Sequence, residues 1–200
     1  MKMRTSLAIP FLAVAMKYLS DETKDCIIGD TMHKQSGKFS IKKVSMKLES
    51  SLTYRNVLFW RIEHDSCYNN VILKIVKKIL SWFFPRLDTI ELGCAGMIGK
   101  DFYLPHRYAV INAKNIGDHV SVLQGVTIGK GPDGNKPIIG NHVVICANAV
   151  VVGGITIGDH VWIGANTFVN FDVPSNSTVK APKSSCNAHV SKKLESMEKR

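Results

Sequence analysis

The chain has 200 residues and a formal net charge of +10, and its 45% hydrophobic content is ample for a buried core. Its basic residues form no stripe interleaved with aromatic residues, which argues against a nucleic-acid partner and leaves a phosphate-bearing small ligand as the better explanation of the charge. The five cysteines form neither a CxxC motif nor a metal-ligand spacing, so we expect reduced thiols in a cytoplasmic protein.

The first 47 residues give only weak evidence of targeting or of secondary structure. Residues 1–15 combine two positive charges with a short apolar run, which is the outline of a signal peptide. That run is minimal and is interrupted by Pro10, so we expect instead an amphipathic segment that packs on the protein or touches a membrane surface. No run reaches the roughly 18 apolar residues that cross a bilayer. Residues 20–47 are polar and aperiodic, which predicts loops or a short extended piece.

Two helices are predicted next, over residues 52–64 and 71–84, because apolar residues recur three and four positions apart and Pro85 stops the second helix. Their aromatic residues, which we expect to pack over the open end of the following domain, are Trp60, Trp82, Phe83 and Phe84. Residues 1–86 are thus predicted to form a helical cap region.

An aliphatic residue returns every six positions over the middle of the chain. With one longer gap, the series runs through Leu92, Ile98, Leu104, Val110, Ile116, Val122, Ile128, Ile139, Ile145, Val151, Ile157, Ile163 and Val169. A hexapeptide repeat predicts a mainly β fold, a parallel β-helix in which three six-residue units close one turn. We expect the aliphatic side chains to point inward and the glycine that often follows each one to ease the corner.

Two irregularities interrupt this repeat. His106 stands at the third position of its unit, where no other unit has a histidine, which makes it a candidate catalytic residue. By contrast, three histidines share one position within Ile-Gly-Asp/Asn-His-Val and are predicted to be solvent-facing parts of the repeat: His119, His142 and His160. The second irregularity is a turn-rich loop over residues 130–137, and loops that leave such a coil commonly border an active site.

No metal site is predicted from these histidines. His142 and His160 are 18 residues apart and so stack on one face of the coil, but no third histidine is placed to complete a zinc ligand set.

The run HRYAVINAKNIGDHVSVLQGVTIGKG, with PIIGNHVVICANAVVVGGITIGDHVWIGANTFV and DVPSNSTV, resembles the hexapeptide-repeat acyltransferases, specifically their serine acetyltransferase-like branch. The resemblance covers about residues 87–179, and YRNVLFWRI resembles the helix before the coil in polysaccharide-locus members. It implies a left-handed β-helix over residues 87–179, a homotrimer, and acetyl-coenzyme A (acetyl-CoA) in the groove between neighbouring coils. The donor implies a cytoplasmic site. The tail, residues 180–200, is predicted to be helical.

The resemblance also implies roles for single residues. His106 matches the family's general base, and Glu91, fifteen positions earlier, matches the acidic residue that orients it. An alcohol is hardly ionised at neutral pH, so an imidazole must take its proton while a carboxylate fixes the imidazole tautomer. The pantetheine arm of the donor would run beside Ala147 and Ala165, and Lys180 or Lys183 would meet its phosphates.

The acceptor is predicted from the positions at which this chain differs from serine acetyltransferases. Serine acetyltransferases have an aspartate before the catalytic histidine and an arginine–histidine pair in the extended loop, where this chain has Pro105, Asn135 and Lys136. Its orienting acidic residue is glutamate, as in sugar-polymer acetyltransferases such as those of colanic acid synthesis. We therefore predict a sugar hydroxyl of a surface polysaccharide as acceptor, bound by Asn135, Lys136 and Arg107. Serine is the alternative acceptor, and a non-catalytic β-helical scaffold is the alternative of another class.

Overall fold

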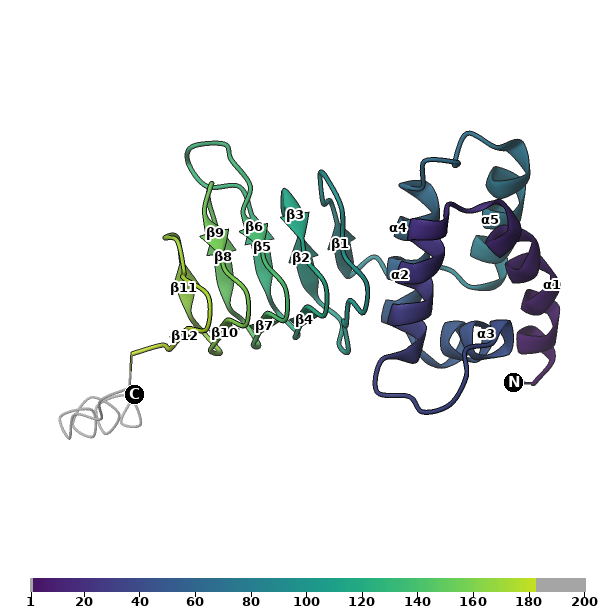
Figure 1. Ribbon diagram of the computed structural model, residues 1–200, viewed down its shortest axis with the longest axis horizontal. Coiled ribbons are helices and arrows are strands. Elements are labelled where there is room, and N and C mark those ends of the chain that lie inside the picture. Colours follow the sequence, from purple (N-terminus) through teal and green to yellow (C-terminus); the bar gives the residue numbers. More distant parts are fainter. Residues whose placement is uncertain (1, 183–200) are drawn as a thin grey trace, which may run out of the picture.

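The computed structural model describes residues 2–182, with side chains from residue 6 onward. Within this range five helices come first and twelve short strands follow, and the strands wind into an elongated coil whose first turn packs against the helices (Figure 1). None of these helices combines the length and the apolar character that crossing a bilayer requires. Lys183 and nearly all of the predicted helical tail lie outside the described residues.

The helical region contains three more helices than the two that the sequence predicted. Its elements are α1 (Lys2–Tyr18), α2 (Asp21–Met32), α3 (Ile41–Ser50), α4 (Leu52–Glu63) and α5 (Val71–Phe83). The predicted helices α4 and α5 are confirmed, whereas the prediction of loops over residues 20–47 is wrong. Serine caps start two of the unpredicted helices, α2 and α3: the Ser20 hydroxyl accepts from the Thr23 N–H, and the Ser40 hydroxyl accepts from the Lys43 N–H.

The helical region has its own hydrophobic core. In α1, which contains Pro10, the buried residues are Ala8, Leu12 and Ala15, and they pack with Leu48 of α3 and Leu80 of α5. This spacing of three and four residues places one face of α1 against its neighbours. The expectation that the N-terminal segment packs on the protein is confirmed.

The coil is a parallel β-helix with three sheets. Its strands are β1 (Ile90–Leu92), β2 (Ala109–Ile111), β3 (Asn115–Ile116), β4 (Ser121–Val122), β5 (Thr127–Gly129), β6 (Ile138–Ile139), β7 (Val144–Ile145), β8 (Val150–Val152), β9 (Thr156–Ile157), β10 (Trp162–Ile163), β11 (Phe168–Val169) and β12 (Thr178–Val179). The sheet orders are β1-β2-β5-β8-β11, β12-β10-β7-β4 and β3-β6-β9, and every pairing is parallel. We call these sheets 1, 2 and 3. The predicted parallel β-helix is thereby confirmed.

The six-residue repeat slips once. All the predicted inward residues from Ile116 to Val169 are buried, but Val110 is exposed and its neighbour Ile111 is fully buried. The register agrees, because Leu92 lies beside Ile111 in the next turn. The prediction that Val110 points inward is therefore wrong. One extra residue precedes the slip, within residues 105–110, and one fewer follows it before Ile116.

The repeated glycines matter because they have no side chain. They do not adopt unusual backbone angles, contrary to our expectation. Gly99, Gly117, Gly140 and Gly158 stack at the corner between sheets 3 and 2, and none of them has a positive φ. A Cβ added to Gly117 would lie 2.7 Å from the backbone of Gly140. Successive turns approach this closely only because no side chain intervenes. The left-handed corner positions belong instead to other residues, among them the three repeat histidines.

A buried ion pair joins the helices to the first coil turn. Arg61 of α4 forms two hydrogen bonds with the Asp30 carboxylate of α2, at 2.8 and 3.1 Å, and also donates to the carbonyl oxygens of Ile98 and Gly99. Asp30 in turn accepts from the Phe102 N–H at 2.8 Å. Both side chains are almost fully buried. The pair therefore fixes residues 98–102 against the helices.

The predicted covering of the open coil end is correct in part. Trp60 and Val57 of α4 are buried within the hydrophobic core of the coil. Phe84 is buried in the helical core, and Phe83 packs against it. Trp82, however, is 80% exposed, so its assignment as a packing residue is wrong.

Candidate active site

His106 lies in the corner that leads from sheet 2 to sheet 1, between Leu104 and β2. Its side chain is exposed, and it has neither a hydrogen bond nor an ion pair to any other described residue. Tyr108, two residues later, is in the left-handed region with φ 65°, and its carbonyl accepts from the Gly125 N–H at 2.6 Å. The corner thus holds the imidazole out from the coil surface.

Glu91 is the central residue of β1 and points outward from sheet 1. Its neighbour in the next turn is Val110, so Glu91 and His106 lie on adjacent turns. The Glu91 carboxylate is exposed and has no partner within the described part of the chain. Asn56 of α4 anchors the segment before it, because its side-chain amide donates to the Leu87 carbonyl at 2.9 Å and its side-chain oxygen accepts from the Leu87 N–H.

The alanines predicted to contact the donor share an edge of the coil with His106. Tyr103 lies beside Ser121 in sheet 2, which aligns the His106 corner with the corners that follow β4, β7 and β10. Ala147 and Ala165 follow β7 and β10, and the Asn166 N–H donates to the Ala147 carbonyl at 3.0 Å. Lys180 follows β12 on the same edge and is exposed. A small side chain at each alanine leaves the backbone of this edge accessible.

The loop over residues 130–137 borders a pocket at another edge, where sheet 1 leads to sheet 3. The pocket has a volume of about 370 Å³, and its lining includes Lys114, Lys130, Asn135 and Lys136. The Lys136 ammonium donates to the Gly93 carbonyl at 3.0 Å. Three cationic side chains around one pocket favour an anionic ligand.

Asn135 has a structural role within this loop. Its side-chain amide donates to the Asp133 carboxylate at 2.9 Å, and its backbone N–H donates to the same group. These hydrogen bonds hold the pKa of Asp133 below its usual range. The Gly154 N–H, in the next turn, also donates to Asp133. The loop is therefore fixed to the coil by its own acidic residue.

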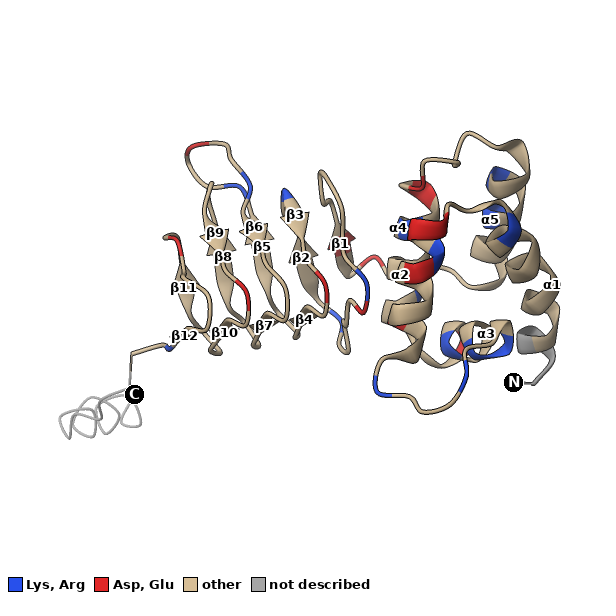
Figure 2. Ribbon diagram, viewed as in Figure 1, with Lys and Arg blue, Asp and Glu red and all other residues tan. Residues whose placement is uncertain are grey.

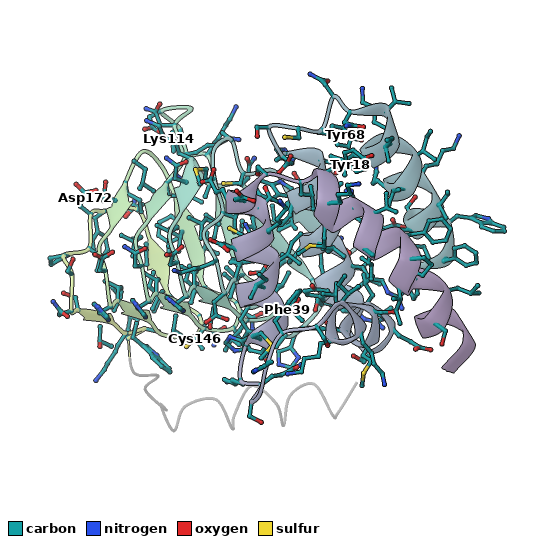
Figure 3. The ribbon with its side chains drawn as sticks, turned by 45° about the vertical axis from the view of Figure 1, so that its right-hand side comes forward. Tyr18, Phe39, Tyr68, Lys114, Cys146 and Asp172 are labelled. Carbon is teal, nitrogen blue, oxygen red and sulfur yellow. The ribbon has the colours of Figure 1, made fainter. Side chains whose placement is uncertain are left out.

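The predicted site residues form two groups in one chain. His106, Arg107, Ala147, Ala165 and Lys180 lie at the edge before the strands of sheet 1, and Asn135 and Lys136 lie at the edge after them. Figure 3 shows this separation through Lys114, which lines the loop pocket, and Cys146, which precedes Ala147, because the two labelled residues lie at opposite edges of the coil. Burial raises the pKa of the Cys146 thiol, which disfavours the thiolate at this edge.

Sequence reasoning missed Lys114 and Lys130 as pocket residues. The Lys114 N–H donates to the Pro137 carbonyl at 2.8 Å, so the loop brings its own end beside Lys114 across one coil turn. That proximity depends on the pairing register between turns of different length. The six-residue repeat alone does not contain this information.

The three repeat histidines occupy the left-handed corner between sheets 3 and 2, with φ values of 55° to 58°. Their rings stack in a column, with centroid distances of 4.5 Å from His119 to His142 and 4.7 Å from His142 to His160. Histidine, asparagine and aspartate tolerate this conformation better than most residues, which explains the repeat. Their prediction as parts of the repeat is confirmed, although His119 is half-buried and contacts Asp101 at 2.8 Å.

The chain is similar in sequence to serine acetyltransferases, although no protein-family model matches it. The enzyme of Helicobacter pylori strain 26695 is 35% identical over 113 residues, which are 54% of this chain and 66% of the relative. The Staphylococcus xylosus enzyme is 38% identical over 114 residues, 54% of this chain and 51% of the relative. The Staphylococcus aureus strain Mu50 enzyme is 43% identical over 95 residues, 45% of each chain. The chain thus spans from under half to just under two thirds of these relatives.

Solved structures of serine acetyltransferases share the fold. The Neisseria gonorrhoeae enzyme aligns with a TM-score of 0.60 at 23% identity, covering 90% of this chain and 79% of that one. Isoform 3 of Entamoeba histolytica, solved in complex with cysteine, aligns with a TM-score of 0.58 at 24% identity, covering 96% and 68%. A serine acetyltransferase in complex with CoA aligns with a TM-score of 0.51 at 22% identity, covering 78% and 64%. About half of this chain is therefore similar in sequence to serine acetyltransferases, and its helix-plus-coil fold is similar to theirs.

Proposed function

We propose that this protein is an O-acetyltransferase that takes an acetyl group from acetyl-CoA and uses His106 as its general base. One observation carries the proposal: the only histidine of the described coil that departs from the repeat is also held out, without a partner, on the edge that presents Ala147 and Ala165. A left-handed sense of the coil and a cytoplasmic location belong to the same proposal, because the resemblance implies both.

The reaction needs a proton acceptor beside the attacking hydroxyl. The hydroxyl oxygen of the acceptor forms a bond to the thioester carbonyl carbon, and the imidazole of His106 takes the hydroxyl proton. As the carbon–sulfur bond breaks, the same proton passes to the departing thiolate. Glu91 lies on the preceding turn and has no partner of its own, which leaves its carboxylate available to orient the imidazole.

A complete site requires a second copy of the chain in this proposal. In a single coil, the edge with His106 and the loop with Lys136 lie at opposite ends of the sheet 1 strands, so they cannot line one pocket. A heterologous contact that closes by rotation would place the loop of one copy beside the His106 edge of the next. We therefore propose a homotrimer with acetyl-CoA bound between neighbouring coils.

Serine is the acceptor that the available observations favour. The relatives at 35–43% identity are serine acetyltransferases, and this reverses the preference for a sugar that the departures alone suggested. The pocket lined by Lys114, Lys130 and Lys136 also suits the carboxylate of an amino acid. Lys136 stands where serine acetyltransferases have the histidine of their loop pair, and it places a cationic group there.

A sugar hydroxyl is the second candidate acceptor, and two residues favour it. Pro105 offers no side-chain carboxylate for the ammonium group of serine beside the catalytic histidine. Asn135, which stands in place of the loop arginine, is engaged with Asp133 through its side-chain amide. A neutral or uronic acid sugar would need neither group.

The acceptor can be determined by measuring thiol release from acetyl-CoA. One reaction contains serine, a second contains glycan fragments with free hydroxyl groups, and a third contains no acceptor. Release that depends on serine, with O-acetylserine as the product, supports the first candidate. Release that depends only on the glycan supports the second candidate. If neither acceptor raises the rate above the third reaction across a broad concentration range, these acceptor assignments are wrong.

A further inference from the structure

Helix α5 has an apolar stripe that no described residue covers. Val71, Ile75 and Trp82 follow a helical spacing of four and seven residues, and all three are exposed, Trp82 by 80% and Val71 by 66%. The opposite face of α5 carries Leu73, Val76 and Leu80, which are buried in the helical core. The helix is therefore apolar on two faces, although only one of them packs within this chain.

Lysines border the exposed stripe on one side. At 100° per residue, Lys78 and Lys74 lie next to Val71 around the helix, and both are exposed. α5 contains no acidic residue, and Figure 2 shows basic but no acidic positions along it. The nearby Glu63 carboxylate is already bonded to Lys77 and Arg86, so it does not neutralise the exposed pair.

This combination fits an anionic lipid surface better than a second copy of the helix. In an antiparallel isologous contact each α5 would face its own copy, which would bring lysines toward lysines without a carboxylate on the helix to pair with them. An anionic bilayer offers apolar depth for the stripe and negative charge for the lysines. Tryptophan is also a preferred residue at the interface between lipid and water.

We propose that the outer face of α5, formed by Val71, Ile75 and Trp82 with Lys74 and Lys78 at its border, docks the protein on an anionic membrane surface. The helix would lie in the plane of the interface. α4 lies between α5 and the first coil strand, so docking through α5 leaves the coil on the water side (Figure 1). The proposal stands apart from the acetyltransferase activity, because none of these five residues belongs to the candidate site.

The test is sedimentation of the full chain with lipid vesicles. One set contains phosphatidylcholine mixed with phosphatidylserine, and the other contains phosphatidylcholine alone. We expect binding to the mixed vesicles that weakens as salt is added. Trp82→Ser should weaken it about tenfold or more, since the indole would lose its apolar environment. Lys74→Glu together with Lys78→Glu should weaken it by about 25-fold or more, from roughly fivefold per lost cation.

Matched variants control for changes unrelated to docking. Phe171→Ser removes an aromatic side chain that is 52% exposed near the far end of the coil, and Lys38→Glu with Lys42→Glu changes the net charge by the same amount elsewhere on the helical region. Both controls should bind within about twofold of the unchanged protein. Equal binding of Trp82→Ser and the unchanged protein contradicts the proposal. The proposal is also contradicted if the unchanged protein binds neither set of vesicles and Trp82→Ser dissociates an oligomer. The outer face of α5 would then be a contact between copies of the chain.

Discussion

Glu91 pairs with Val110, nineteen positions later in the chain, whereas Val110 pairs with Thr127 after only seventeen. The turn that contains His106 is thus one residue longer than the eighteen-residue spacing between Tyr103 and Ser121. The surplus residue falls in the corner that projects the His106 side chain. One residue is inserted at this corner, and the next unit is one residue shorter. The inserted residue allows the corner to present an imidazole that a regular turn does not present.

Removing the Glu91 charge should slow acetyl transfer without weakening donor binding. Glu91→Gln keeps the size of the side chain but loses the carboxylate that is proposed to fix the His106 tautomer, so we expect kcat to fall by about tenfold to a hundredfold or more. KM for acetyl-CoA should change little. Glu91→Asp should recover part of the rate, and Asp88→Asn, an exposed carboxylate nearby, should behave like the unchanged protein. An unchanged kcat in Glu91→Gln would remove this residue from the mechanism.

Lys136, which lies in the loop over residues 130–137, should contribute to binding of the acceptor. Lys136→Met removes a cation from the pocket with Lys114 and Lys130, and we expect KM for an anionic acceptor to rise about tenfold or more, in line with the loss of one charge-assisted contact. Steady-state kinetics at saturating donor measures this. Lys100→Met removes an exposed lysine whose nearest carboxylate is 3.9 Å away, and it serves as the control. A neutral acceptor would show no such rise in KM, which would favour the sugar candidate.

Breaking the buried pair at the helix–coil junction should destabilise the whole protein. Arg61→Met leaves the Asp30 carboxylate buried without its cation, and we expect the free energy of unfolding to fall by about 3–5 kcal/mol. Urea unfolding followed by circular dichroism measures the change. Lys24→Met disrupts the exposed pair with Asp21 and should leave the free energy of unfolding nearly unchanged, because solvent screens that pair. Similar losses of unfolding free energy in the two variants would show that burial does not increase the cost of breaking the Arg61–Asp30 pair.

Acid should weaken the contact between α4 and α5. Burial opposes ionisation of Glu63, but hydrogen bonds from Arg86 and Lys77 outweigh it and hold the pKa of this carboxyl below its ordinary value of 4.5. The stabilisation is therefore complete above pH 4.5 and is lost as the pH falls through the lowered pKa. Glu63→Gln should flatten this dependence and cost about 1 kcal/mol at neutral pH. The unfolding free energy measured from neutral to acid pH checks both statements, and parallel curves for the two proteins would contradict them.

The coil could be predicted from sequence because its core repeats one contact many times. Each aliphatic residue from Ile116 onward stacks on an equivalent in an adjacent turn, so the period survives in the sequence. Val110 was assigned to the wrong face because Val110 and Ile111 are both aliphatic, and hydrophobicity alone does not reveal a slip of one residue. α2 escaped prediction because a residue as polar as Asp30 is buried in it through its pairing with Arg61, which is distant in sequence.

The candidate site was predictable to the extent that its residues depart from the repeat. His106 was found because no other unit has a histidine at its position, and the loop was found because it lengthens one unit. The division of the site between two coil edges was not predictable, because it depends on which corner each residue occupies in three dimensions. Trp82 was misassigned because a tryptophan at helical spacing looks the same in sequence whether it packs inside or faces outward.

The imidazole of His106 is proposed to remove the proton of the acceptor hydroxyl. The most direct measurement compares thiol release from acetyl-CoA, with the identified acceptor, in His106→Asn and His142→Asn. Asparagine suits the left-handed corner of His142, since Asn176 occupies the equivalent corner with φ 60°. We predict that His106→Asn lowers kcat by about 10²- to 10⁴-fold with an unchanged oligomeric state, and that His142→Asn retains the full rate. Equal rates in the two variants would show that His106 is not the general base.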